Sequence, residues 1–155
     1  MTSEQLQDLR ELLSSQRLLS LSVLIDGAPY AGLLPYTFVP EHGAVLVHAS
    51  KLARHTRGLE PGARFSMVIH RPDRPDADPL QVPRVTLEGT VEVLERGTDD
   101  YREGQRSYIA RFPSSEQTFQ LGDFNLYHLR FEKGRYVGGF ARAVNVTARD
   151  VKLLA

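Results

Sequence analysis

A stretch of nine residues in which apolar and polar side chains alternate constrains the fold more than any other feature of the sequence. From Val85 to Val93 every second residue is apolar or glycine, and the residues between them are threonines and glutamates. Successive side chains of a β-strand point to opposite faces, so this period of two predicts a strand with one buried face. The other face is expected to meet solvent or a partner.

The same period recurs along the chain, separated by turns and helical patterns. The predicted strands are residues 18–25, 30–39, 44–49, 65–70, 85–93, 124–131 and 135–140. Hairpin turns are predicted at Asp26–Gly27 and at residues 132–134. Six or seven antiparallel strands with two or three brief helices predict a mainly β fold, a small barrel with helices at its openings.

The helices are predicted from capping residues and helical spacing. One runs from a capping box at Thr2 to about Ser15, one covers residues 51–59, and one lies between Thr98 and Pro113. The tail from Thr147 forms one more helical turn or frays. Residues 71–83 hold four prolines and three aspartates, which predicts a surface loop. Nothing resembles a linker, so residues 1–155 are expected to form a single domain.

Composition narrows the function classes. The 155 residues include no cysteine, which excludes disulfides, thiolate nucleophiles and cysteine-ligated zinc. The 19 Lys and Arg residues balance 19 Asp and Glu residues, so no overall basic field favours nucleic acid or an anionic membrane. We find neither an apolar run of membrane-spanning length nor a secretory signal, and therefore expect a cytoplasmic protein.

Residues 50–57 form a cationic segment directly after a predicted strand. If Ser50 caps a helix, free backbone N–H groups and the helix dipole meet there, a combination that favours phosphate. Lys51 and His55 are four residues apart and would share one helix face. A solvated helix with ordinary surface cations explains the same pattern, so both interpretations remain open.

Other candidate sites are weaker. The five histidines show no metal-ligand spacing, so no metal site is expected, and His48 and His128 lie in strands where a structural role is favoured. No nucleophile elbow, dinucleotide fingerprint or phosphate loop occurs. The glycine pair within residues 134–142 marks either a close backbone crossing or a place where a flat ring lies against the backbone, with Arg142 at its polar edge.

Six segments of the chain, in order, match one family. They are residues 28–32 (APYAG), 50–56 (SKLARHT), 83–89 (PRVTLEG), 108–113 (YIARFP), 123–127 (DFNLY) and 134–142. On these segments the sequence resembles the FMN-binding split barrels related to pyridoxamine 5'-phosphate oxidase, and within them the HugZ-like haem-utilisation branch. The resemblance covers roughly residues 5–145.

The resemblance implies a homodimeric split barrel with two FMN sites in the interface, each using residues of both chains. Residues of the second strand would run along the flavin ring, and those after the third strand would hold the flavin phosphate. Arg84 and Arg142, from later segments, would also contact the flavin. The implied cofactor-binding residues are Tyr30, Ala31, Gly32, Leu33, Ser50, Lys51, His55, Thr56, Arg84 and Arg142.

Departures from the family pattern narrow the expected chemistry. The oxidase proper carries an arginine and a lysine where this chain has Tyr30 and Pro35. Tyr108 and Arg111 are three residues apart where the oxidase has four, which on a helix rotates one side chain by about 100°. Pyridoxamine phosphate is therefore not the expected substrate. The haem-degrading relatives have a C-terminal extension with a histidine ligand, which is not found before Ala155, so haem turnover is not expected either.

The leading hypothesis is an FMN-binding homodimer that acts as an oxidoreductase on an unknown small molecule, with the chemistry supplied by the flavin. No side chain is identified as a general acid or base, so no catalytic residue is assigned. One rival is a haem-binding protein that uses His48 or His128 as a ligand. Another is a dimeric binding or stress-response module without a cofactor.

Overall fold

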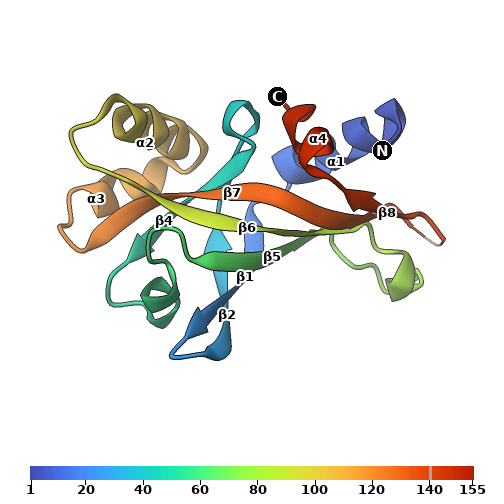
Figure 1. Cartoon of the computed structure of the whole chain (residues 1–155), viewed down its shortest axis with the longest axis horizontal. Coiled ribbons are helices and arrows are strands. Elements are labelled where there is room, and N and C mark those ends of the chain that lie inside the picture. Colours follow the sequence, from blue (N-terminus) through green and yellow to red (C-terminus); the bar gives the residue numbers. More distant parts are fainter. Residues whose placement is uncertain (140) are drawn as a thin grey trace.

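The computed structural model describes residues 1–139 and 141–155, and their centre is one curled antiparallel sheet (Figure 1). The strand order is β2-β1-β5-β6-β7-β4-β3, with β8 beside β7. The strands are β1 (Leu18–Ile25), β2 (Ala28–Pro35), β3 (Thr37–Val39), β4 (Ala44–Ser50), β5 (Arg64–His70), β6 (Arg84–Leu94), β7 (Phe124–Val137) and β8 (Ala143–Val146). The predicted mainly β barrel with short helices is confirmed, and this part of the chain forms eight strands instead of six or seven.

Helices lie at the margins of the sheet (Figure 1). The α-helices are α1 (Ser3–Ser15), α2 (Asp99–Arg111), α3 (Glu116–Phe119) and α4 (Ala148–Lys152). The 3₁₀ helices are η1 (Pro40–His42), η2 (Arg54–Gly58), η3 (Pro79–Gln81) and η4 (Pro113–Ser115). In residues 1–139 and 141–155 no helix is long and apolar enough to cross a membrane. The cytoplasmic location stays a prediction.

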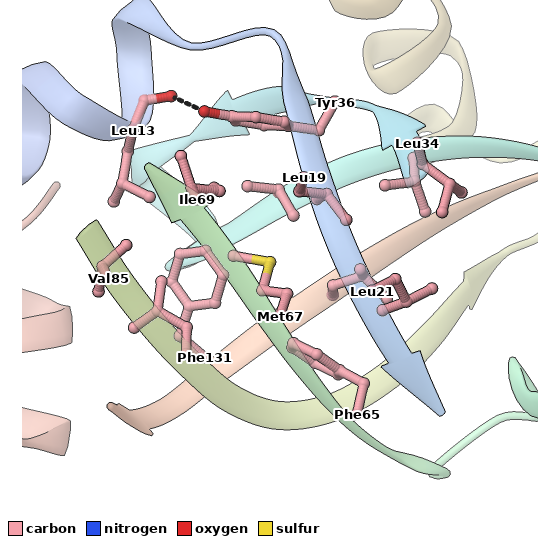
Figure 2. Close-up of a cluster of buried hydrophobic side chains, with 14 of the residues drawn as sticks. Leu13, Leu19, Leu21, Leu34, Tyr36, Phe65, Met67, Ile69, Val85 and Phe131 are labelled. Carbon is pink, nitrogen blue, oxygen red and sulfur yellow. Dashed lines mark hydrogen bonds between the residues drawn. The ribbon is translucent and has the colours of Figure 1, made fainter. Parts of the chain in front are cut away.

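Tyr36 explains why the sheet curls. It is the single residue between β2 and β3, which stand at the two ends of the strand order, so the sheet has to bend until its edges meet. The Tyr36 side chain is completely buried, and its hydroxyl donates a 2.7 Å hydrogen bond to the carbonyl oxygen of Leu13 in α1 (Figure 2). The predicted continuous strand over residues 30–39 is therefore two strands with different neighbours.

The concave side of the sheet holds the main core. Alternate residues of β1, β5, β6 and β7 point inward and pack under α1, as a period of two requires. The side chains labelled in Figure 2 are Leu13, Leu19, Leu21, Leu34, Tyr36, Phe65, Met67, Ile69, Val85 and Phe131. The alternation from Val85 to Val93 is thus confirmed as a strand with one buried face.

A second, smaller core lies on the outer side of β4 and β7, where α2 covers the sheet. Its buried members are Val39, Ala44, Leu46, Leu94, Tyr101, Tyr108, Phe119 and Leu126. Gly104 lets α2 come close, because a Cβ there would lie 3.0 Å from a methyl group of Leu126. One stretch of the outer side is therefore covered by the chain itself.

Local signals placed most element ends correctly. α1 begins at the capping box formed by Thr2 and Gln5, and the Thr98 hydroxyl caps α2. Asp26 and Gly27 both have positive φ, 52° and 77°, as the tight turn between β1 and β2 requires. The tail forms the capped helix α4.

The predicted hairpin turn at residues 132–134 is wrong. β7 runs through it without a break from Phe124 to Val137, and the chain turns at residues 138–142 before β8. Gly134 serves a close approach, since a Cβ there would collide with the carbonyl oxygen of Thr86 on β6. The glycine pair Gly138–Gly139 stands in the true turn. The predicted last strand ended at Phe140, which lies outside the described residues.

Candidate functional site

The segment after β4 is not the helix that the sequence predicted over residues 51–59. The only regular helix there in the described structure is η2, which begins after Ala53 without a side-chain cap. The Ser50 hydroxyl accepts a 3.1 Å hydrogen bond from the Leu52 N–H and donates one of 3.0 Å to Asp123 Oδ2. The predicted cluster of free N–H groups at a long helix end is therefore wrong, and with it the first physical argument for phosphate.

Two contacts explain why the segment folds tightly. The Thr56 hydroxyl donates a 2.6 Å hydrogen bond to the carbonyl oxygen of Ser50, which closes the loop on itself. Gly58 packs against β1 so closely that a Cβ would lie 2.6 Å from the Val23 side chain. A straight α-helix from Lys51 would not satisfy both contacts.

Lys51 and His55 do not share a face. Lys51 and Thr56 line a pocket of about 300 Å³ together with Asn125 and Tyr127 of β7. His55 instead lies against β2, where a Cβ on Gly32 would be 3.1 Å from its Nδ1. The expectation of a common face assumed one α-helix through both residues, whereas Lys51 lies in a turn and only His55 belongs to η2.

The four predicted residues of β2 also divide between two faces. Tyr30 and Gly32 face η2, where the Arg54 guanidinium lies 5.2 Å from the centre of the Tyr30 ring and His55 contacts Gly32. Ala31 and Leu33 point to the other side and are exposed. Burial lowers the pKa of His55, so its imidazole is uncharged near neutral pH and is a poor partner for phosphate.

Arg84 and Arg142 lie at the other end of the sheet. Arg84 pairs with Val137 and Ser50 pairs with Phe124, so β7 separates the two ends by roughly 40 Å along the strand. The Arg84 guanidinium donates two 3.0 Å hydrogen bonds, to the carbonyl oxygens of Leu80 and Val82 in the surface loop. Arg142 lies 4.0 Å from Glu4 of α1. In one chain the ten predicted residues therefore do not converge.

His48 and His128 are buried beneath α2 and α3. The His48 ring stacks on Phe119 with 3.8 Å between ring centres. Burial, with the nearby charge of Arg96, lowers the pKa of His48 to about 4; burial, with His42, lowers the pKa of His128 to about 4. Both rings are therefore uncharged near neutral pH. Within the described residues no group of three or more metal-ligating side chains comes together.

The outer side of β2, β1 and β5 is an uncovered surface that the sequence analysis did not single out. Most of its residues are small or apolar, with Arg64 and His70 at the two ends of β5, and Leu18, Leu24 and Leu33 are exposed by 51%, 59% and 64%. We call it the bare face, formed by Leu18, Ser20, Ser22, Leu24, Pro29, Ala31, Leu33, Ser66 and Val68. The sequence contained a signal, because a period of two puts these apolar residues outside once their neighbours are known to be inside.

A hollow on the outer side of β6 and β7 adjoins the bare face. Its volume is about 640 Å³, and Thr86, Lys133, Gly134 and Arg135 line it together with β8 and the start of α4. The Arg135 guanidinium donates a 2.7 Å hydrogen bond to the Asn145 side chain, and Lys133 lies 3.3 Å from Glu88. The bare face thus runs into a hollow whose wall carries two cations, Lys133 and Arg135, and two carboxylates, Glu88 and Glu132.

Residues 6–138 match the family model described as pyridoxamine 5'-phosphate oxidase. The chain belongs to this family. The curved antiparallel sheet is the split barrel that the sequence resemblance implied.

Two relatives connect this member of the family to haem. "Heme oxygenase HutZ" of Vibrio cholerae is 25% identical over 146 residues, which is 93% of this chain and 82% of the relative. The solved "heme binding protein from Mycobacterium smegmatis" is 26% identical, with a TM-score of 0.85 over 99% of this chain and 62% of that one. The resemblance to the haem-utilisation branch is confirmed. The chain spans less than two thirds of the mycobacterial protein.

A second solved structure adds support for the fold alone. The "FAD and Heme binding protein from Mycobacterium smegmatis" is 19% identical, with a TM-score of 0.58 over 91% of this chain and 70% of that one.

Proposed function

We propose that this chain binds haem as a homodimer. The observation that carries the proposal is the similarity to the mycobacterial heme-binding protein, which extends over 99% of the chain. The leading hypothesis from the sequence, an FMN oxidoreductase, becomes the second candidate because the relatives at 25–26% identity are named for haem.

The geometry of the outer surface supports a flat, apolar and anionic ligand. Haem presents a planar ring and two carboxylates, so it needs apolar contact along the ring and cations at one edge. The bare face provides apolar contact at Val68, which pairs with Thr86 at the edge of the hollow, and the hollow of about 640 Å³ provides Lys133 and Arg135 beside Glu88 and Glu132. That volume lies within the ~300–1,000 Å³ of typical ligand pockets. In this arrangement Arg135 would hold one carboxylate, Lys133 would exchange its contact with Glu88 for the other, and the iron would supply the redox chemistry.

The buried histidines do not suit the haem role proposed for them from the sequence. His48 is sealed by aromatic rings, and His128 borders a pocket of only about 230 Å³. Haem could reach neither without unpacking α2. We therefore assign no iron ligand within this chain.

A second copy of the chain would complete the haem site and would bring together predicted site residues that lie far apart in one chain. Apolar surface that is contiguous and exposed is typical of interfaces. Twofold pairing through the bare face would cover Leu18, Leu24 and Leu33 on both copies. It would also bring the Arg84 end of one chain towards the partner, as composite sites of the family require.

The second candidate function is FMN binding at Lys51. The pocket of about 300 Å³ that Lys51, Thr56 and Arg57 line offers the Lys51 ammonium to a phosphate group, while Arg57 is paired with Asp26 at 3.0 Å and Glu60 adds one carboxylate. A flavin bound there would make the chain an oxidoreductase whose small-molecule substrate and electron donor are unassigned.

Absorbance spectra and gel filtration test both proposals. Titration with hemin should produce a Soret band, and Arg135→Ala should weaken binding by about tenfold or more through loss of a charge-assisted hydrogen bond. Arg106→Ala, an exposed arginine on α2, is the matched control and should bind hemin normally. Flavin bands that weaken with Lys51→Ala, and no Soret band, would favour FMN. A monomer that takes up neither ligand would contradict both.

A further inference from the structure

The covered half of the sheet contains a pocket that the proposed cofactor sites do not use. It lies between α2 and η1, above β4 and β7, where the loop near residue 40 stands beside α2 (Figure 1). Its volume is about 230 Å³, below that of typical drug-sized pockets. The side chains of Glu41, His42, Asp100, Glu103 and His128 are on its wall.

Three carboxylates on this wall lack a cation. Glu41, Asp100 and Glu103 form no ion pair with any described residue, whereas neighbouring charges are matched in the pairs Arg102–Asp99 and Arg130–Glu92. Asp100 lies in the first turn of α2, where a carboxylate also stabilises the helix dipole. The acidic residues alone therefore do not define a site, and a second observation is needed.

That observation is the ring of His128. The residue is 3% exposed, and its buried Nδ1 has no hydrogen-bond partner, at 4.0 Å from Glu92 Oε1. Because Nδ1 is enclosed, the edge of the ring that borders the pocket carries Nε2. The carboxylate of Glu92 favours a proton on Nδ1 of the uncharged ring, which leaves a lone pair on Nε2. Nε2 is not enclosed and no described residue donates to it, so this acceptor is open to a donor that enters the pocket.

We propose that this pocket binds a small organic molecule with a primary ammonium group. An ammonium ion has three N–H donors and no acceptor, which matches Nε2 of His128 together with the carboxylates of Asp100 and Glu103. A directly ligated metal ion fits less well, because its ligands must approach to about 2.0–2.4 Å and no described cluster of three or more such side chains can hold one, whereas ammonium N–H donors reach acceptors at about 2.7–3.2 Å. The site is independent of the haem and flavin proposals, since it lies under α2 on the covered half.

Titration of the full chain with 1,4-diaminobutane tests the proposal. The readout is the ¹⁵N shift of the His128 ring in histidine-selective NMR spectra at neutral pH and low salt. We expect a saturable shift of Nε2 at millimolar amine. The double variant Asp100→Asn/Glu103→Gln should lower the affinity by about tenfold or more, because it removes charge-assisted acceptors from exposed positions.

Two controls separate a site from simple charge attraction. The variant Glu95→Gln/Glu116→Gln removes two exposed negative charges outside the pocket wall and should change the affinity by less than about twofold. Tetramethylammonium has the same charge as an alkylammonium ion without N–H donors, and should bind much more weakly. Equal binding of tetramethylammonium, equal loss in both double variants, or no saturable shift would each overturn the proposal. Thermal unfolding of each variant verifies that it is folded.

Discussion

The outer side of the sheet is covered over one half and uncovered over the other. Over β4 and β7, α2 and α3 bury residues such as Leu46 and Leu126, which are completely inaccessible to solvent. Over β2, β1 and β5 lies the bare face, on which Leu24 and Leu33 are more than half exposed. Both halves carry apolar side chains at outward positions, and only the first has a helix from the same chain above it.

This difference separates residues that stabilise the fold from residues available to a partner. Outward apolar residues under α2 are part of a core, so folding has already removed the unfavourable free energy of exposing them to water. Outward apolar residues on the bare face are still exposed to water, and a second copy or a flat ligand could remove this unfavourable exposure. The same alternating pattern in the sequence thus serves folding in one half and, in our proposal, assembly in the other.

A matched pair of leucine truncations should show the largest contrast. Leu126→Ala creates a cavity under α2 and should lower the free energy of unfolding by about 2–5 kcal/mol. Leu24→Ala on the bare face should change it by less than about 0.5 kcal/mol, because the side chain is 59% exposed. Urea unfolding at a concentration where the protein is monomeric measures both. Similar losses at the two positions would mean that the bare face is part of the folding core.

Acid should destabilise the covered half next most strongly. Burial lowers the pKa of His48 and of His128 to about 4, whereas an unfolded histidine titrates near 6.5. Between these values the unfolded chain binds more protons, so stability is complete above about pH 6.5 and declines as the pH falls towards 4. At pH 5 each histidine should reduce the free energy of unfolding by about 2 kcal/mol.

Variants test which histidines cause this loss. Urea unfolding between pH 7.5 and 5 should show a smaller decline in His128→Gln than in the parent protein. His70→Asn, on β5 in the uncovered half, should decline as the parent does because His70 is exposed. A decline that depends on His70 would contradict the assignment to the covered half.

The sequence predicted the sheet because its local signals and its packing agree. Alternation identified β6, and the capping box at Thr2 identified α1, since each depends only on neighbouring residues. The errors arose where a distant strand decided the local structure. Gly134 resembles a turn residue, yet its lack of a side chain accommodates Thr86 of β6. No window around residue 134 contains that information.

The candidate site was less predictable for the same reason. Residues 51–59 were treated as an α-helix, which put Lys51 and His55 on one face, whereas contacts to Ser50 and Val23 impose a tight loop. The resemblance named Arg84 and Arg142 as cofactor residues, and they lie at the far end of the sheet. A second chain could bring these groups together only through a particular contact surface, and the sequence of one chain does not identify that surface.

The smallest effect should come from one leucine of the bare face. Leu33 is 64% exposed, so burial against a second copy contributes roughly half of what complete burial of a leucine does, about 1 kcal/mol per copy. Because both copies lose this contribution, Leu33→Ser should raise the dimer dissociation constant by about thirtyfold, measured by analytical ultracentrifugation. Leu153→Ser, an equivalent change at 51% exposure on the C-terminal segment, should leave the constant unchanged. If both variants dissociate alike, the copies meet through another surface; if the parent protein is monomeric at all concentrations, the bare face needs a different occupant.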